Sequence, residues 1–478
     1  MVPLYVRYMG IEAYGLVGFY AMLQGWFMLL DMGLTPAVSR EAARFSGGAT
    51  DALELRRLVR SLEGVFAVVG IIALLWMIAG ADFVARNWLK VESLELSEVR
   101  NAIALMAIIV VFRWVGGLYR GLINGFEHIV WLSGFNAIIA TLRFVLVVAY
   151  LIRFGATPTH FFMYQVVIAV AELSILVGKT YRLLPPVDVA GWLRWELSPL
   201  KKILVFAASA AFTSTVWVLV MQADKLMLSG LIPLGQYAVY TMGVLMAGGI
   251  TMLSGPVTGA VLPRLVRLNA DGDEVGLLRL YRASTQLIVV VAFPVVLILA
   301  FFPFQVLLLW TGQKEVSDSA AHILSLYAIG NGILSVAGVP YLLQVARGNL
   351  NLHVKSNLIF VCLYLPMLYF AVIEYSMAGA GYAWILSNLL PFLFWLPVVH
   401  RKFLPGVHLR WLLEDILLIT LLPLAIATLA SRYLDLGTEK WAIVLMLAAL
   451  YVVLLASAIF SSSALRTRLI PHYPWSKL

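Results

Sequence analysis

The sequence contains a single cysteine, Cys362, and few charged residues. One cysteine excludes a disulfide framework and the cysteine-rich metal motifs, and we predict that Cys362, which lies in an apolar stretch, fills the core. Aspartate, glutamate, lysine and arginine make up 12% of the 478 residues, whereas a soluble domain carries about 25%. The shortage of charge therefore excludes a soluble protein.

The sequence motifs of several enzyme classes are also missing. No Gly-x-x-x-x-Gly-Lys-Ser/Thr loop occurs, which excludes ATP hydrolysis at a phosphate-binding loop of that type. The seven histidines are scattered, so they suggest neither a metal site nor a Ser-His-Asp set. We therefore expect a protein that is not an enzyme and that needs no cofactor.

The chain instead contains many long apolar runs. Hydrophobic residues make up 62% of it, and runs of about twenty residues recur that can each cross a hydrocarbon layer about 30 Å thick. Barrel strands would be about ten residues of alternating polarity, so these runs predict an all-α polytopic membrane protein. The thirteen predicted spans are 12–34, 61–81, 98–119, 129–152, 159–181, 203–230, 236–262, 281–304, 318–346, 353–375, 379–400, 413–432 and 440–461.

The basic residues are distributed unevenly between the connections. The formal net charge is +9, and most lysines and arginines fall in alternate connections, beginning with 35–60. This is the bias that places basic connections in the cytoplasm. It predicts a cytoplasmic C-terminus and contact with anionic membrane lipids, and it gives no reason to expect a nucleic-acid partner.

A short pattern that occurs twice suggests two related halves. Arg120-Gly121-x-x-Asn124 and Arg347-Gly348-x-x-Asn351 each follow a long apolar run, and we interpret both as helix ends with glycine as the stop. Related halves with a site between them are typical of transporters. We predict an N-terminal lobe at 1–181, a linker with an interfacial helix at 182–202, a C-terminal lobe at 203–402, and an added helical pair with a basic tail at 403–478.

The predicted orientation also bears on where the chain starts. If 35–60 is cytoplasmic, Met1 lies outside without a signal peptide, and the opening residues look like the outer end of a helix whose beginning is absent. We expect a missing first helix, and so fourteen spans arranged as two six-helix lobes and a pair. A genuine thirteen-helix protein is the alternative.

Four stretches of the chain resemble the Wzx-type oligosaccharide flippases, in the polysaccharide-transporter branch of the multidrug/oligosaccharide-lipid/polysaccharide exporter superfamily. They are Tyr8-Met-Gly-Ile-Glu-Ala-Tyr-Gly-Leu, Asp31-Met-Gly-Leu-Thr-Pro-Ala-Val-Ser-Arg-Glu-Ala-Ala-Arg, Asp224-Lys-Leu-Met-Leu-Ser-Gly and Val261-Leu-Pro-Arg-Leu-Val-Arg-Leu-Asn-Ala-Asp-Gly-Asp. The resemblance implies a V-shaped transporter. It also implies transport of a polyprenyl-pyrophosphate-linked oligosaccharide from the cytoplasmic to the outer leaflet, for surface polysaccharide synthesis in a bacterial or archaeal inner membrane.

Ionisable residues inside the spans are the first candidates for the site, because each costs about 2.5–3.5 kcal/mol to insert. Arg143 has no acid near it in sequence, so it either binds an anionic substrate or pairs with Glu172 on another helix. Glu172 can take up a proton, which suggests coupling to protons or sodium as the alternative to a static pair. Arg113 either lines the cytoplasmic mouth or extends its head toward lipid phosphate.

A second group of candidates is weaker. The resemblance implies that Asp224 is structural or an ion-coupling site. Its neighbour Lys225 points about 100° away, too far round the helix to pair well. Gln222 and Asn331 can either bind sugar hydroxyls or join helices. Arg40 follows the span 12–34 and Arg264 follows the span 236–262. There they either make the first contact with the pyrophosphate or set the orientation of the protein in the membrane.

Three other functions remain open on the sequence. A cation-coupled multidrug exporter of the same superfamily would favour a buried acidic site, and here the spans carry arginines as well as carboxylates. A flippase for the peptidoglycan precursor differs only in its substrate. A membrane-embedded sugar polymerase or ligase would need catalytic residues on a sizeable outer loop, whereas the expected outer connections are short. Polymerase machinery is instead an expected partner.

Overall fold

The computed structural model describes residues 1–186, 198–434, 437 and 439–469, and throughout this part of the chain the regular secondary structure is helical. Eleven helical stretches within it are long and apolar enough to cross a membrane. The predicted all-α polytopic fold is confirmed. The predicted spans 353–375 and 379–400 fall in one stretch, Asn351–Phe403, which is broken at Ser376 by a φ of 52°. The number of spans stays a prediction.

By its contacts the chain divides into two compact units, Met1–Ala238 and Val239–Leu478. The helices of the first unit are α1 (Val2–Met9), α2 (Ile11–Phe27), η1 (Met28–Asp31), α3 (Leu34–Ser46), α4 (Ala52–Phe83), η2 (Val84–Trp88), α5 (Leu96–Gly125), α6 (Ile129–Thr141), η3 (Leu142–Leu146), α7 (Val147–Phe154), α8 (Pro158–Leu183) and α9 (Ser198–Leu231).

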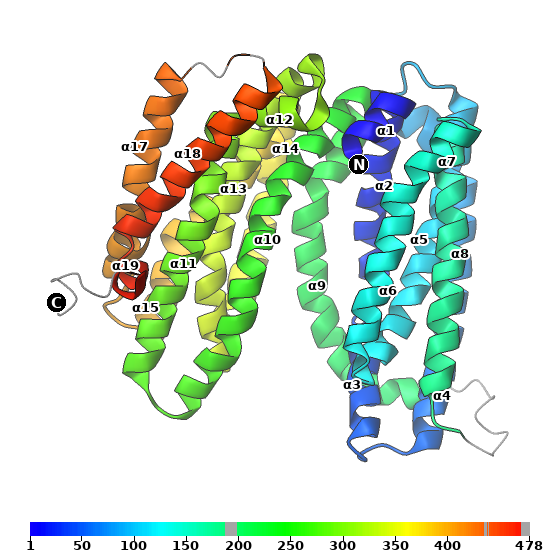
Figure 1. Cartoon of the computed structure of the whole chain (residues 1–478). Coiled ribbons are helices and arrows are strands. Elements are labelled where there is room, and N and C mark those ends of the chain that lie inside the picture. Colours follow the sequence, from blue (N-terminus) through cyan, green and yellow to red (C-terminus); the bar gives the residue numbers. More distant parts are fainter. Residues whose placement is uncertain (187–197, 435–436, 438, 470–478) are drawn as a thin grey trace. The chain divides into compact units, whose positions relative to one another are not determined.

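The second unit begins within the long helix α10 (Leu234–Ala270) and runs to the end of the chain. Its other helices are α11 (Glu274–Phe301), α12 (Pro303–Thr311), α13 (Lys314–Ala346), α14 (Asn351–Leu390), η5 (Pro391–Trp395), α15 (Leu396–Phe403), α16 (His408–Leu412), η6 (Leu413–Leu417), α17 (Leu418–Tyr433), α18 (Lys440–Ser461) and α19 (Ser463–Leu469). Figure 1 shows their order along the chain.

Side-chain caps fix where several of these helices begin. Asp51 accepts a hydrogen bond from the backbone N–H of Leu53 at the start of α4. Thr157 and Asp273 do the same for His160 at α8 and Gly276 at α11. Short polar residues are preferred here because their oxygens satisfy N–H groups that have no partner inside the helix. The caps therefore set the ends of the connections that precede α4, α8 and α11.

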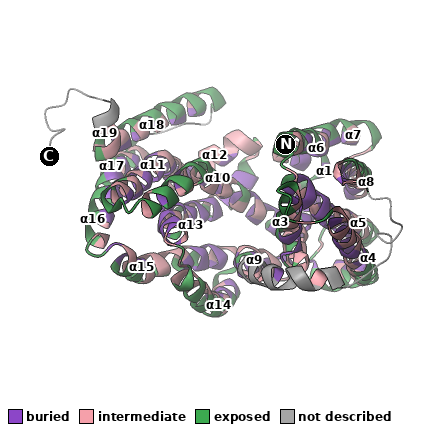
Figure 2. Cartoon of the chain, turned by 90° about the horizontal axis from the view of Figure 1, so that it is seen from below, coloured by how far each residue is buried: buried purple, intermediate pink, exposed green. Residues whose placement is uncertain are grey.

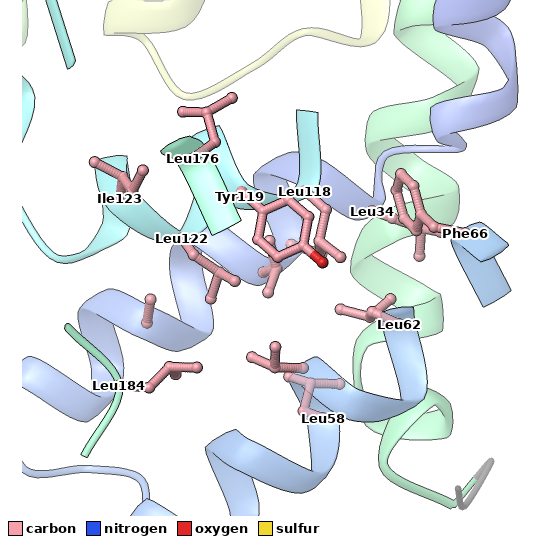
Figure 3. Close-up of a cluster of buried hydrophobic side chains, with 14 of the residues drawn as sticks. Leu34, Leu58, Leu62, Phe66, Leu118, Tyr119, Leu122, Ile123, Leu176 and Leu184 are labelled. Atoms are coloured by element: carbon pink, nitrogen blue, oxygen red, sulfur yellow. The ribbon is translucent and has the colours of Figure 1, made fainter. Parts of the chain in front are cut away.

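In the first unit α5 is the central helix. It packs against α3, α4 and α8, and Figure 2 shows its residues as largely buried. Figure 3 shows part of the apolar cluster that it forms with α3, α4 and α8, including Leu118, Leu122 and Leu176. Gly125 permits the close approach of α3, because a Cβ there would lie 2.2 Å from the Ser39 carbonyl oxygen. The same apposition places the neighbouring turns of α5 beside η1 and α3.

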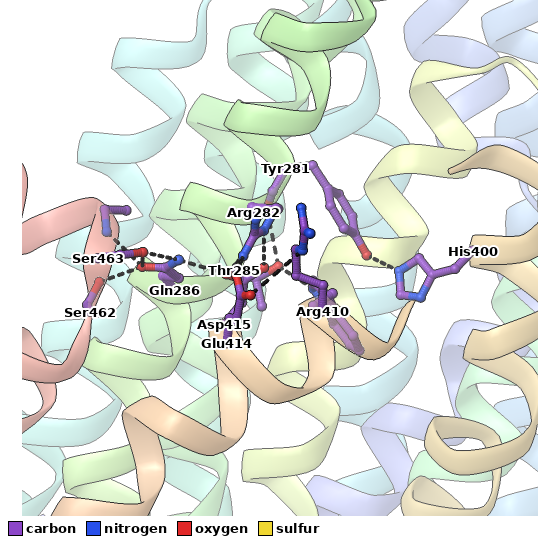
Figure 4. A network of polar contacts seen from close by, with 12 residues as sticks. Tyr281, Arg282, Thr285, Gln286, His400, Arg410, Glu414, Asp415, Ser462 and Ser463 are labelled. Carbon is purple, nitrogen blue, oxygen red and sulfur yellow. Dashed lines mark hydrogen bonds and ion pairs between the residues drawn. The ribbon is translucent and has the colours of Figure 1, made fainter. Parts of the chain in front are cut away.

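In the second unit α11 and α13 are the most buried helices. α11 contacts α13, α17 and α18, so the C-terminal helical pair packs on this unit's core. A polar network joins them (Figure 4). Arg282 of α11 donates from Nε to Asp415 Oδ2 at 2.7 Å and from Nη2 to Glu414 Oε2 at 2.6 Å. Gln286 donates to Asp415 at 2.7 Å and accepts from Ser462 at 2.7 Å. This network ties α11 to η6 and to the start of α19.

The two copies of the repeated pattern differ in structure. Arg347 is the C-cap of α13 and Gly348 has a φ of 64°, so the prediction of a helix end is confirmed there. It is wrong for Arg120, because α5 continues to Gly125. Gly121 is instead a packing residue, since a Cβ there would lie 2.8 Å from the Thr35 carbonyl oxygen. The placement of Cys362 in the core is also wrong, because this residue is exposed.

The predicted lobe limits stay predictions. The linker helix expected at 182–202 falls largely on residues 187–197, which lie outside the described residues. α9, which covers the predicted span 203–230, packs against α2, α3 and α4 and belongs to the first compact unit. The limit between the compact units therefore falls after α9 rather than before it.

The network of Arg282 predicts unequal effects of its two carboxylates on stability. Asp415 is fully buried, whereas Glu414 is half-exposed at 49%. We expect Asp415→Asn to lower the free energy of unfolding by about 2 kcal/mol, because it removes a buried charged acceptor of hydrogen bonds from Arg282 and Gln286. Glu414→Gln should cost no more than about 1 kcal/mol. Thermal unfolding of the purified protein in detergent measures both, and equal effects would contradict this account of the network.

Candidate functional site

The first unit contains a cavity of about 730 Å³, lined by residues of α2, η1, α3, α5, α6, η3, α8 and α9. Part of the lining is apolar, with Phe27, Val110 and Trp114 among it. The rest is polar and carries charges of both signs. The polar and charged lining residues are Gln24, Asp31, Thr35, Arg113, Arg120, Asn136, Arg143, Glu172 and Thr215.

Two of the cavity arginines come from one face of α5. Arg113 and Arg120 are seven residues apart, about two helical turns, so their side chains project on the same side. Both reach Glu172 of α8, which is 2% exposed. Arg120 donates a hydrogen bond from Nη2 to Glu172 Oε1, and the Nε of Arg113 lies 3.6 Å from Oε2. One buried carboxylate is thus shared between two guanidinium groups.

Arg143, the third arginine, is held in a different way. It is 5% exposed and lies on the π-helical turn η3. Its Nε donates to Gln165 Oε1 at 3.0 Å, and its Nη2 donates to the hydroxyl of Tyr20 at 3.0 Å. Arg143 lines the cavity, and among the described residues the ion-pair partners of Glu172 are Arg113 and Arg120 rather than Arg143. Binding of an anionic substrate by Arg143 stays a prediction.

The charges of the cavity do not balance. Its three arginines face two carboxylates, Glu172 and Asp31. Asp31 is engaged at the start of α3, where it accepts from the backbone N–H of Thr35 at 3.3 Å and from the Thr35 hydroxyl. One positive charge therefore remains in excess. Arginine binds phosphate oxygens through two parallel N–H groups, so an oxyanion is the ligand that this lining suits best.

The remaining predicted site residues lie elsewhere. Arg40 and Arg264 are exposed on α3 and α10 and do not line the cavity. Asn331, in the second unit, donates to the carbonyl of Ala247 at 2.8 Å and accepts from Trp384 Nε1 at 3.0 Å, which is a helix-joining role.

Two predicted residues lie on α9 without lining the cavity. Gln222 packs where α2 approaches α9, since a Cβ on Gly25 would lie 2.4 Å from its Nε2. Asp224 is buried, and its Oδ1 lies 3.3 Å from Lys225 Nζ. The expectation that these neighbours are poorly placed to pair is therefore wrong. The long lysine side chain folds back along the helix and also reaches the Met221 carbonyl at 2.5 Å.

Several cavity residues were not among those predicted from the sequence, above all Arg120. Its position in a repeated Arg-Gly pattern suggested a helix end, but its spacing from Arg113 was the useful signal. Asn136, whose Oδ1 accepts from Arg120 Nε at 3.4 Å, belongs to the same cluster. Asp31 and Thr35 lie in a stretch that the sequence marked for its resemblance alone. Their cavity positions follow from the packing of η1 and α3 beside α5.

Comparison with known proteins gives consistent results. A sequence model of the polysaccharide biosynthesis protein family matches residues 1–269. A protein of Shigella flexneri named "Putative O-antigen transporter" is 22% identical over 391 residues, which cover 80% of this chain and 89% of that protein.

Several solved structures share the fold. The lipid II flippase MurJ in an inward closed conformation matches with a TM-score of 0.70 at 12% identity, over 96% of this chain and 97% of that one. An inward-facing multidrug resistance MATE family transporter of the MOP superfamily matches with a TM-score of 0.62 at 14% identity, over 83% and 93%. At these identities the likeness concerns the fold alone.

The ion pairs of the cavity predict which charge exchange the protein tolerates. Glu172→Arg alone places three guanidinium groups together and should sharply reduce the amount of folded protein. Adding Arg120→Glu restores opposite charges across the α5–α8 contact and should recover part of that loss. Adding Arg143→Glu in place of Arg120→Glu should not recover folded protein, because Arg143 hydrogen-bonds to Gln165 and Tyr20 and not to Glu172. Yield and thermal unfolding in detergent compare the three variants, and recovery with Arg143→Glu would contradict the observed pairing.

Proposed function

The chain belongs to the polysaccharide biosynthesis protein family, and we propose that it is a flippase for a polyprenyl-pyrophosphate-linked oligosaccharide. The proposed substrate moves from the cytoplasmic to the outer leaflet, where it is used to build a surface or exported polysaccharide. The observation that carries the proposal is the excess of arginine over carboxylate in the cavity of the first unit.

The chemistry of such a substrate explains why an arginine-rich cavity would serve it. A pyrophosphate and a hydroxyl-rich sugar cannot enter hydrocarbon without polar partners, whereas the lipid tail can stay in the bilayer. Arginine keeps its charge at any working pH and offers a planar set of donors to phosphate oxygens. Gln24 and Asn136 in the same lining can bind sugar hydroxyls. A cavity of about 730 Å³ has the size of a typical ligand site.

Glu172 is a counter-ion within the cavity lining. It accepts a hydrogen bond from Arg120 and forms an ion pair with Arg113, whose Nε lies 3.6 Å away, so it competes with a phosphate for both guanidinium groups. An arriving pyrophosphate would compete with this carboxylate for both arginines, and Glu172 would then need a proton or a sodium ion in their place. This is how we propose that transport is coupled, with the cavity opening alternately to the two sides of the membrane.

The remaining expectations extend this proposal. We place the protein in a bacterial or archaeal inner membrane with its C-terminus in the cytoplasm, on the evidence of the basic connections. Membrane lipids surround it, and polymerase machinery would take up its product. A multidrug exporter of cations is less well supported, because three arginines at the cavity repel a cationic substrate.

The direct test locates the lipid-linked oligosaccharide across the membrane in cells that lack this protein and any redundant flippase. We expect it to accumulate facing the cytoplasm and wild-type protein to relieve the accumulation. Arg143→Ala should reduce relief at least tenfold, because it removes a cavity guanidinium. Arg153→Ala is the matched control, since Arg153 is exposed at the end of α7 and does not line the cavity.

The outcomes separate the function from the site. Normal translocation without the protein would refute the flippase. If Arg143→Ala relieved the accumulation as well as wild type does, the flippase function would stand and Arg143 would have no part in it.

A further inference from the structure

The π-helical turn that carries Arg143 is held by side chains from outside its own helix. Three consecutive carbonyl oxygens of η3 each accept a side-chain hydrogen bond. Tyr164 donates to Leu142 at 2.9 Å, and Gln165 donates from Nε2 to Arg143 at 2.9 Å. The third bond, from the hydroxyl of Tyr5 to the carbonyl of Phe144, is 2.7 Å long. The donors come from α8 and α1, which are distant from η3 in the sequence.

There is a physical reason for three donors at this place. A membrane helix interrupted by a π turn has to find new partners for the backbone groups that the change of register frees, because hydrocarbon supplies none. π turns recur at functional sites. The described residues contain four of them, η2, η3, η5 and η6, and η3 is the one that contributes to the cavity lining. Here the three external bonds are made to the carbonyl of the cavity arginine, Arg143, and to those of its two neighbours, Leu142 and Phe144.

Gln165 contacts both the backbone and the side chain of Arg143. Its Nε2 donates to the Arg143 carbonyl, while its Oε1 accepts from the Arg143 Nε at 3.0 Å. Gln165 is 1% exposed, so this paired contact is fully enclosed. Tyr20 holds the Nη2 of the same guanidinium. Neither contact uses Nη1, so the group is held in place without all its donors being occupied.

We propose that Gln165, with Tyr164 and Tyr5, positions Arg143 by stabilising η3 in its π-helical register, so that the guanidinium faces the cavity. Conversion of the turn to α-helix would shift one flank by one residue, which is about 100° of rotation. Weakening the three bonds would therefore turn Arg143 out of the cavity. The part of this inference that concerns substrate binding rests on the proposed function. The part that concerns the position of Arg143 rests on the geometry of the turn alone.

A thiol-labelling experiment tests the position without any substrate. Cys362→Ala removes the single cysteine, and Arg143→Cys then reports whether residue 143 faces the cavity. We expect a charged, water-soluble methanethiosulfonate to label it quickly in the purified protein, and at least tenfold more slowly once Gln165→Leu is added. Gln24→Cys, in the cavity lining on α2, is the control and should label equally with and without Gln165→Leu.

The labelling result decides the proposal in either direction. Equal rates for Arg143→Cys with and without Gln165→Leu would overturn it, provided that Gln24→Cys shows an intact cavity. If Gln165→Leu alone does not fold, Tyr5→Phe removes one bond to the turn at a smaller cost. It should still slow labelling at residue 143 and leave Gln24→Cys unchanged.

Binding of inorganic pyrophosphate to the purified protein then connects position to function. We expect Gln165→Leu to weaken binding about tenfold in the wild-type background and to have no further effect when Arg143→Ala is present, because a positioning residue acts through the group it positions. Equal losses in both backgrounds would show that Gln165 acts independently of Arg143. If wild-type protein binds no pyrophosphate, the proposed function fails, and the labelling experiment still decides the role of Gln165.

Discussion

Glu172 joins two arginines of α5 to α8, and the properties of the cavity depend on that shared contact. A carboxylate that is 2% exposed is costly to bury without charged partners, and Arg113 and Arg120, whose side chains are 26% and 22% exposed, supply them. Two guanidinium groups meeting one carboxylate leave a positive charge over, and Arg143 adds another. Asp31 offsets part of it while serving the start of α3. The site therefore has a cationic character that its own residues do not cancel.

The polar network of the second unit shows what a balanced arrangement looks like. Arg282 and Arg410 meet Asp415 and Glu414, two of each sign, and Gln286 occupies much of what remains. The charges in this network balance, so it offers no net charge to a ligand. Its contacts hold α11, η6 and α19 together. The contrast with the first unit comes from stoichiometry, since both networks use arginine and carboxylate at similar distances. The first unit's cavity has more arginines than carboxylates, whereas the second unit's network has equal numbers. This difference in net charge distinguishes a candidate binding site from a contact that only holds helices together.

The sequence predicts the fold well because the length of an apolar run is a local property that hydrocarbon thickness constrains. It also predicts that Arg143 matters, because an arginine inside such a run is costly wherever it points. It does not predict the partners of Glu172, since these depend on α5 packing along α8. It does not predict η3 either, because nothing in the composition of Leu142–Leu146 distinguishes a π turn from the α-helix around it. Register is decided by Tyr5, Tyr164 and Gln165, which are remote in sequence.

The repeated Arg-Gly-x-x-Asn pattern shows how burial, rather than the motif, assigns a role. Both arginines contact a glutamate and an asparagine: Arg120 meets Glu172 and Asn136, while Arg347 meets Glu274 and Asn269. Glu274 is 60% exposed, so its ion pair with Arg347 is screened by solvent and contributes about 1 kcal/mol or less. Glu172 is enclosed, so the same chemistry at Arg120 sets the charge of a cavity. The two arginines of the repeated pattern thus meet the same kinds of partner, and the depth at which they meet them determines whether the contact forms part of a cavity.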